Sequence, residues 1–152
     1  FNNMKVKEIM EPVVITLKSS DTYEEAARVL YTNAISGAPV LDDAGKVVGI
    51  VSEEDLFRIV YPYYRSYYDH PEMYVDYEER ERKMSEIKHH KVEIFMSKNV
   101  VGVDPETPVL QAGAVMLARD IMRMPVIKDG ELVGIVNRKT IYHAVLKNNF
   151  KF

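Results

Sequence analysis

One short segment in the first half of the chain combines residue types that can bind a small polar molecule. It runs from Gly49 to Asp55, Gly-Ile-Val-Ser-Glu-Glu-Asp, where an apolar run meets a polar helix start. The first turn of a helix offers unpaired backbone N–H groups that attract phosphate. The Asp55 carboxylate can accept two hydrogen bonds from a vicinal diol, such as the 2′ and 3′ hydroxyls of a ribose. Ser52 followed by an acid three residues later is also an ordinary capping box, which needs no ligand.

The other polar residues do not form a pattern typical of catalysis or metal binding. Ser52 has no base nearby in the sequence that would make it a nucleophile, and Asp55 has no second acid beside it. His89 and His90 are adjacent, so on a helix they would point about 100° apart and rarely share one ion. We therefore expect no enzyme activity, no metal and no required cofactor.

The elements that position Gly49 to Asp55 occur twice in the chain. Lys5 to Met10 (KVKEIM) is matched by Lys91 to Met96 (KVEIFM), 86 residues later, and Val48 to Val51 (VGIV) returns at Val133 to Val136. A duplicated unit of about 55 residues cannot easily close a hydrophobic core alone. We therefore expect the two copies to pack on each other and to form two related clefts.

Each copy has the pattern of a strand, a helix, a hairpin and a second helix. In the first copy the β-branched run 13–17 predicts a strand, and Asp21 with Glu24 predicts a capped helix. A hairpin follows, with strands at 38–41 and 47–51, and Ser52 opens a helix through residue 60.

The second copy repeats this plan with different local chemistry. Residues 100–103 predict the strand, and Thr107 with Pro108 predicts a helix start. Asp129-Gly130 is typical of a two-residue hairpin turn. Asn137 opens a last helix that should end at about residue 147 or 148.

An insertion at 61–90 separates the copies and is rich in tyrosine. It holds seven of the ten tyrosines of the chain, at positions Tyr61, Tyr63, Tyr64, Tyr67, Tyr68, Tyr74 and Tyr77. Residues 76–88 predict an exposed helix, because acids precede bases by four residues. The segment is too aromatic for a flexible tether, so it packs either on its own chain or on a partner.

The ordered set of motifs, present twice, resembles the paired cystathionine-β-synthase (CBS) repeat family. The resemblance implies an α/β (α+β) fold of two pseudo-symmetric β-α-β-β-α repeats packed as one module, with repeats at 4–60 and 91–148 flanking the Tyr-rich insertion. In that family, adenosyl ligands bind in clefts between the repeats. AMP, ADP, ATP, S-adenosylmethionine and NAD all present the ribose diol that such a cleft recognises.

The resemblance assigns residues to the first cleft one by one. Ser52 and Asp55 match the family's ribose-binding positions. The opposite repeat supplies the other walls: base-stacking positions at Val101 and Ile121, Met122 beside them, and basic positions at Arg123 and Lys139.

The second cleft departs from the family pattern. Thr140 stands where the family has an acid, and Ser36 with Gly37 replaces a basic residue at the phosphate-facing end. We expect this cleft to be empty, weak or altered in preference. Its residues are Ile15, Ile35, Ser36, Asn137 and Thr140.

The composition narrows the class of function further. The formal net charge of −3 argues against nucleic acid as the main partner, and no apolar run approaches the length of a membrane span. We expect a cytoplasmic, homodimeric, non-catalytic regulatory module that senses adenine nucleotides, and hence cellular energy, and acts on an unknown regulated protein. The alternative is a protein-interaction module with vestigial clefts that docks a partner through the Tyr-rich insertion.

Overall fold

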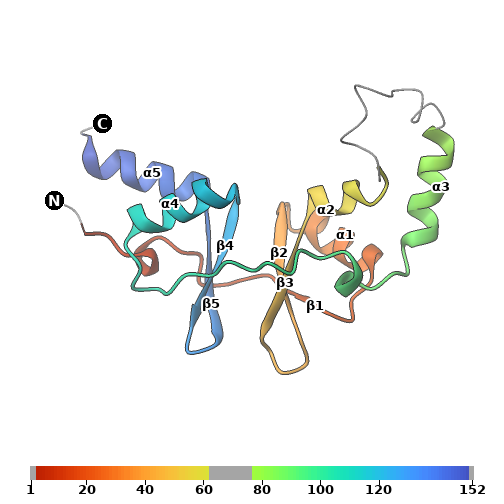
Figure 1. Ribbon diagram of the computed structural model, residues 1–152, viewed down its shortest axis with the longest axis horizontal. Helices are drawn as coiled ribbons and strands as arrows, with labels where there is room; N and C mark the ends of the chain where they lie inside the picture. The colour runs from red at the N-terminus through yellow and green to blue at the C-terminus, as the bar shows by residue number, and fades with distance from the viewer. Residues whose placement is uncertain (1–2, 62–76, 151–152) are drawn as a thin grey trace. The chain divides into compact units, whose positions relative to one another are not determined.

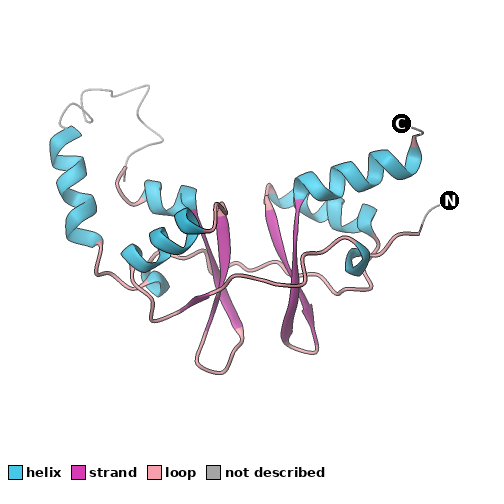
Figure 2. Cartoon of the chain, turned by 180° about the vertical axis from the view of Figure 1, so that it is seen from behind, coloured by secondary structure: helices cyan, strands magenta, loops and turns pink. Residues whose placement is uncertain are grey.

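The computed structural model describes residues 3–61 and 77–150, which separate into two compact units (Figures 1 and 2). We call the unit formed by Thr16–Asp43 and Val48–Lys98 the N-repeat unit. The C-repeat unit is formed by Phe1–Ile15, Ala44–Val47 and Asn99–Phe152. The expected packing of Tyr63, Tyr64, Tyr67, Tyr68 and Tyr74 concerns residues outside the described parts.

The N-repeat unit holds a three-stranded sheet with helices above one end of it. Its strands are β1 (Leu17–Lys18), β2 (Gly37–Leu41) and β3 (Val47–Ser52), in that order across the sheet, with β1 parallel to β2. Its helices are α1 (Tyr23–Thr32), α2 (Glu53–Arg58), α3 (Tyr77–Ile87) and the 3-10 turn η4 (Val92–Ile94). The core is formed by apolar side chains from these elements, among them Leu17, Tyr23, Ala26, Leu30, Val40, Val51, Leu56, Ile87 and Val92.

The C-repeat unit repeats this plan around a two-stranded hairpin. It contains the 3-10 turn η1 (Val6–Glu8), α4 (Val109–Arg119), β4 (Arg123–Lys128), β5 (Glu131–Asn137) and α5 (Arg138–Asn149). Strands β4 and β5 are antiparallel, and their turn points away from the helices (Figure 1). Asp129 and Gly130 have φ angles of 52° and 81°, as the predicted two-residue turn requires. The core includes Val6, Ala112, Met116, Met124, Val126, Val136 and Ile141.

The segment that precedes the first strand of each repeat, Lys5 to Glu11 or Lys91 to Ser97, pairs with a strand of the other repeat. We call these two stretches the leading segments. Glu11 forms an antiparallel bridge with Ile135, and Ser97 forms the equivalent bridge with Ile50. In both bridges two backbone hydrogen bonds of 2.8–3.0 Å join the residues. The compact units therefore differ from the two sequence repeats, because each unit includes the segment that precedes the other repeat.

Two glycines make the pairing of the leading segments with β3 and β5 sterically possible. A Cβ atom added to Gly49 would lie 2.5 Å from Met96 Sδ, and one added to Gly134 would lie 2.6 Å from Met10 Sδ. Real Cβ atoms do not approach other atoms so closely, so each methionine occupies the space that a side chain would fill. Gly49 and Gly134 therefore let the leading segments lie flat against β3 and β5.

Both predicted first strands are largely wrong. In the first copy the strand is confined to Leu17–Lys18, and Val13 is 85% exposed. In the second copy Val103 makes one parallel bridge with Val126, and residues 100–102 lie outside any described strand. Their β-branched side chains favour extended backbone, but a strand also needs a hydrogen-bonding neighbour along its length.

The predicted helix starts are confirmed in two cases and displaced by one residue in two others. Ser52 and Asn137 cap α2 and α5 as expected. Helix α1 is capped by Thr22, because the Asp21 carboxylate accepts the Lys18 N–H at 2.8 Å and closes the preceding turn. Helix α4 is preceded by Pro108 at the cap position rather than by Thr107.

Candidate functional site

The predicted ribose-binding pair lies where β3 runs into α2. The Ser52 hydroxyl accepts the Asp55 N–H at 3.1 Å, and Asp55 Oδ2 accepts the Ser52 N–H at 2.9 Å. The capping-box interpretation of this segment is therefore correct. The second carboxylate oxygen, Oδ1, lies 3.5 Å from Arg58 Nη1, and the Asp55 side chain is only 13% exposed.

These contacts leave Asp55 with capacity for a ligand. A carboxylate has about four lone-pair sites on its two oxygens. The capping bond and the Arg58 ion pair occupy two of them, so both oxygens can still accept a hydroxyl. Arg58, which was not among the predicted residues, lies beside this carboxylate and also forms a closer ion pair with Glu54, at 2.6 Å. Its signal was the Asp-x-x-Arg spacing, which places the two side chains on one face of the helix.

The backbone at the start of α2 is less available than the sequence suggested. The Glu53 N–H donates to the Ser36 carbonyl at 2.9 Å, and the Asp55 N–H donates to Ser52. Two of the first three helical donors are therefore occupied within the N-repeat unit. The chemistry that this end of the site can offer comes mainly from the carboxylate.

The corresponding helix start in the C-repeat unit has lost the acid. The Asn137 side chain accepts the Thr140 N–H at 2.8 Å and caps α5. The Arg138 N–H donates to the Met122 carbonyl at 3.0 Å, which repeats the Glu53–Ser36 contact. The backbone framework of the two sites is thus duplicated, whereas the carboxylate occurs in one copy.

Several predicted residues gather at this end of the C-repeat unit. Arg123 pairs with Asn137 across the β4–β5 ladder, and Met122, which is 56% exposed, directly precedes it. Lys139 is exposed in the first turn of α5. Arg138, which was not among the predicted residues, lies among them and forms an ion pair with Asp120 at 3.3 Å. The result is a concentration of positive charge beside a partly exposed apolar side chain.

The remaining predicted residues are distributed over both units. Val101 and Ile121 are half-buried against the core of the C-repeat unit, and Ile15, 37% exposed, belongs to the same unit. Ile35 is half-buried and Ser36 is exposed in the N-repeat unit. The residues predicted for each cleft therefore come from both units. For the first cleft, Ser52 and Asp55 belong to the N-repeat unit, whereas Arg123 and Lys139 belong to the C-repeat unit. For the second cleft, Ile35 belongs to the N-repeat unit and Thr140 to the C-repeat unit.

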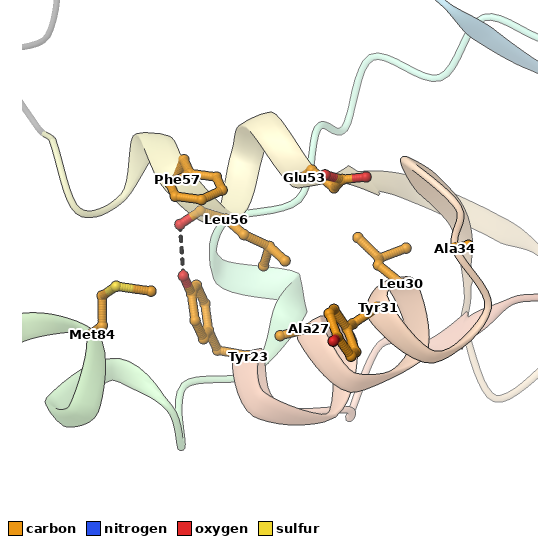
Figure 3. A pocket seen from close by; sticks show the side chains of 9 residues that line it. All are labelled: Tyr23, Ala27, Leu30, Tyr31, Ala34, Glu53, Leu56, Phe57 and Met84. Atoms are coloured by element: carbon orange, nitrogen blue, oxygen red, sulfur yellow. Dashed lines mark hydrogen bonds between the residues drawn. The ribbon is translucent and has the colours of Figure 1, made fainter. Parts of the chain in front are cut away.

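A separate apolar groove, which was not predicted from the sequence, lies in the N-repeat unit. It has a volume of about 460 Å³ between α1, α2 and α3 (Figure 3). The Tyr23 hydroxyl donates to the Leu56 carbonyl at 2.7 Å at one side of it, and burial raises the pKa of Tyr23. The lining residues are Tyr23, Ala27, Leu30, Tyr31, Ala34, Glu53, Leu56, Phe57 and Met84.

Residues 3–61 and 77–150 contain neither a candidate metal site nor a candidate membrane span. Within these ranges no three His, Asp or Glu side chains are placed to hold a metal ion together. The helices of the same ranges include none with the length and apolar character that a membrane crossing needs.

The fold and the site together define a class: a duplicated α/β unit in which polar side chains stand at the strand-to-helix junctions. The chain belongs to the CBS domain family, whose model matches residues 6–62 and again residues 91–147. The resemblance inferred from the paired motifs is therefore confirmed, and so is the mixed fold of two repeats.

Related proteins share this fold over most of the chain. A CBS domain-containing protein of Dictyostelium discoideum is 29% identical over 93% of this chain and 91% of its own length. The crystal structure of CBSX2 of Arabidopsis thaliana in complex with AMP has a TM-score of 0.72 and 26% identity, covering 96% of this chain and 98% of that one. The CBS domain pair of protein MJ0100, in complex with 5′-methylthioadenosine and S-adenosyl-L-methionine, has a TM-score of 0.71 and 25% identity over 93% and 99% of the two chains.

Other relatives carry the same region inside larger proteins. The chain covers between 14% and 24% of three curated enzymes that it matches. CBS pairs thus occur both as small proteins and as parts of enzymes.

Proposed function

We propose that this protein is a non-catalytic regulatory module that binds an adenosyl ligand in a cleft between its two repeats. The observation that carries the proposal is the Asp55 carboxylate, which the Ser52 N–H holds in place beside Arg58 and which keeps acceptor capacity for two hydroxyls. A ribose diol is the ligand group that fits such a paired acceptor.

The ligands of related structures support this choice. AMP, 5′-methylthioadenosine and S-adenosyl-L-methionine, which are bound to CBS pairs of similar fold, share an adenosyl group with a free 2′,3′-diol and differ in the substituent on the 5′ carbon. Recognition through the diol therefore accounts for what these ligands have in common. The group beyond the 5′ carbon decides which of AMP, ADP, ATP, S-adenosylmethionine or NAD binds this chain.

The C-repeat unit supplies the remaining contacts in this proposal. The side chains of Val101, Ile121 and Met122 stack against the adenine, which is an apolar, flat group. Arg123 and Lys139 face the 5′ substituent and favour phosphate over a neutral or cationic group. The second cleft, with Ile15, Ile35, Ser36, Asn137 and Thr140, binds more weakly because a single Thr hydroxyl replaces the paired acceptor.

We extend the proposal to the setting in which the module works. The resemblance to paired CBS repeats leads us to propose a cytoplasmic homodimer that reports the energy state of the cell to a regulated protein. The alternative function, docking of a partner through the Tyr-rich insertion with vestigial clefts, requires no ligand.

A calorimetric panel of adenosyl compounds tests the proposal against this alternative. The panel contains adenosine, AMP, ADP, ATP, S-adenosylmethionine and NAD, each paired with a thermal unfolding measurement. A bound ligand at one hundred times its dissociation constant adds about 2.7 kcal/mol to stability, so binding must also raise the melting temperature. Absence of heat and of stabilisation with all six compounds would contradict the proposal and favour the interaction module.

A further inference from the structure

The three helices that form the apolar groove of the N-repeat unit are bonded to one another. The Tyr23 hydroxyl donates to the Leu56 carbonyl at 2.7 Å and joins α1 to α2 beside the groove. The chain directly after α3 is joined to the start of α1. There the Tyr23 N–H donates to the His90 carbonyl at 2.7 Å, and the Glu24 N–H donates to the Lys88 carbonyl at 3.1 Å. The groove is therefore held open by the fold of this one unit.

Large apolar side chains line the groove and remain accessible. Tyr31 on α1 is 89% exposed and Phe57 on α2 is 59% exposed. Met84 on α3 points toward Tyr23 (Figure 3). Aromatic and methionine side chains are enriched where proteins meet, and the flexible methionine adapts to the shape of a partner. Accessible side chains of this kind, gathered in one groove, indicate an interaction site.

The helices around the groove carry negative charge. Helices α1, α2 and α3 together hold nine acidic and five basic residues, a formal charge of −4. Glu53, the first residue of α2, is itself a lining residue. Within residues 3–61 and 77–150, Glu24 and Glu54 form ion pairs with arginines of their own helices, whereas no cation pairs with Glu53. The groove is thus complementary to an occupant that is apolar on one face and basic beside it.

Helix α2 belongs both to the groove and to the proposed ligand site. Leu56 and Phe57 line the groove together with Glu53, while Asp55 of the same helix is the proposed ribose contact. The helix has only six residues, so a shift of one of its faces moves the other face as well. A protein seated in the groove would therefore contact the element that holds the ligand.

We infer that the apolar groove is the docking site of the regulated protein and takes an amphipathic helix of that protein, apolar on one face and flanked by lysine or arginine. This inference rests on the proposed regulatory function and adds where and how the partner is recognised. Helices that dock in grooves insert apolar side chains spaced i, i+3 or i+4, and i+7. The groove, at about 460 Å³, has room for a few such side chains. A basic side chain beside them pairs with the Glu53 carboxylate.

Fluorescence anisotropy with a labelled model peptide tests this docking. The probe is an amphipathic peptide of leucine and lysine, about 18 residues long, with its leucines on one helix face. A second peptide has glutamate in place of every lysine. We expect the leucine–lysine peptide to bind wild type about tenfold more tightly than the leucine–glutamate peptide. Its affinity should also fall as the salt concentration rises.

Two groove variants and a matched control locate the binding. Tyr31→Ser with Phe57→Ser removes the exposed aromatic rings and should weaken binding of the leucine–lysine peptide about tenfold or more. Glu53→Gln should weaken it about threefold or more and reduce its salt dependence. Leu110→Ser with Leu117→Ser is the control, because these side chains of α4 are 65% and 61% exposed and do not line the groove. The control should bind the peptide within about twofold of wild type.

Several results would overturn the inference. These are no binding of the leucine–lysine peptide at about 200 μM protein, equal affinity for the leucine–glutamate peptide, or an equal loss in the α4 control. Sedimentation equilibrium tests a second copy of the chain as the occupant instead. If Tyr31→Ser with Phe57→Ser abolished self-association and wild type bound no peptide, the groove would belong to the second copy.

Titration with AMP keeps this inference apart from the proposed function. Tyr31→Ser with Phe57→Ser should keep wild-type affinity for AMP, because neither residue belongs to the predicted ligand site. Peptide binding without AMP binding in wild type would contradict the ligand proposal and leave the docking site standing. AMP binding without peptide binding would overturn the docking site alone. Far-ultraviolet circular dichroism and thermal unfolding verify that all variants fold.

Discussion

Asp55 caps a helix, and we propose that the same carboxylate also binds the ligand. Its Oδ2 caps the start of α2 through the Ser52 N–H, and its remaining acceptor capacity is the proposed ribose contact. The capping and ligand-binding interpretations of Ser52 and Asp55 are therefore compatible, because a carboxylate accepts more hydrogen bonds than a cap requires. Thr140 can do neither in the same way, since its hydroxyl lacks the second acceptor oxygen.

Tyr23 connects the two helices that border the groove. Tyr23→Phe removes the hydroxyl that donates to the buried Leu56 carbonyl at 2.7 Å, while the ring keeps its edge contact with Phe95 at 5.5 Å. We expect a loss of about 1–2 kcal/mol in the free energy of unfolding, measured by urea denaturation. Tyr31→Phe, at a side chain that is 89% exposed, is the control and should change stability by less than about 0.5 kcal/mol. Equal stability of the two variants would show that the Tyr23 hydroxyl contributes nothing.

Arg123 and Lys139 should determine preference among ligands rather than ligand binding as such. Arg123→Gln or Lys139→Gln removes a charge that the proposal places at the 5′ phosphate, where charge-assisted hydrogen bonds contribute about 1.5–3 kcal/mol. We expect at least tenfold weaker AMP binding in calorimetry, a weaker dependence on salt, and less than threefold change for adenosine. Lys128→Gln, at an exposed position at the end of β4, is the control. Equal losses for AMP and adenosine would remove both residues from the phosphate position.

At the scale of elements, the leading segments hold the strands that precede each site. Gly49→Ala would bring a Cβ atom to 2.9 Å from the Ser97 carbonyl oxygen as well as against Met96. The flexible Met96 side chain can move, but the backbone of the bridge cannot do so without losing its two hydrogen bonds with Ile50. We expect a loss of about 1–3 kcal/mol in stability, by analogy with overpacked cores, measured by denaturant unfolding.

The side chain beside this contact supplies the control for Gly49→Ala. Ser97 is exposed, so Ser97→Ala keeps the backbone bridge and should cost less than about 0.5 kcal/mol. A Gly49→Ala protein as stable as wild type would show that the leading segment is not held against β3 as described.

Much of this architecture could be predicted from local signals, and the exceptions have physical causes. Ser52, Asn137 and Asp129-Gly130 were sufficient to place two helix starts and a turn, because caps and tight turns depend on few neighbouring residues. The strands at 13–17 and 100–103 could not be judged, since strand formation depends on a partner elsewhere in the chain. The pairing of each leading segment with the other repeat could not be predicted either. Gly49 and Gly134 both leave room for a methionine, so the sequence does not show which leading segment lies against which hairpin.

The candidate site was predictable only in part for a similar reason. Spacing identified Ser52 and Asp55, whereas the occupied donor of Glu53 and the ion pair of Arg58 depend on how α2 packs in the folded unit. The groove was not predictable because its walls come from three helices far apart in the sequence.

For the whole molecule, duplication followed by divergence is the main theme. The first repeat has an acid, Asp55, at the start of its second helix, whereas the second repeat has Thr140 there. Helices α1 and α2 carry a net negative formal charge, and α4 and α5 a net positive one. We therefore expect unequal ligand sites, with one strong site per chain and the Thr140 cleft at least tenfold weaker by calorimetry. Thr140→Asp should strengthen the weak site only in part, because Ser36 and Gly37 still leave phosphate charge unbalanced. Two equal sites in the wild type would contradict this asymmetry.

Titration of AMP into wild-type protein and into Asp55→Asn tests the central claim most directly. The asparagine oxygen can still accept the Ser52 N–H and cap α2, so the fold is kept, but the second acceptor and the charge are lost. The claim predicts that wild type binds AMP and that Asp55→Asn binds it at least thirtyfold more weakly, a loss of about 2 kcal/mol, with its melting temperature nearly unchanged in the absence of ligand. Wild-type affinity for AMP in Asp55→Asn would contradict the account.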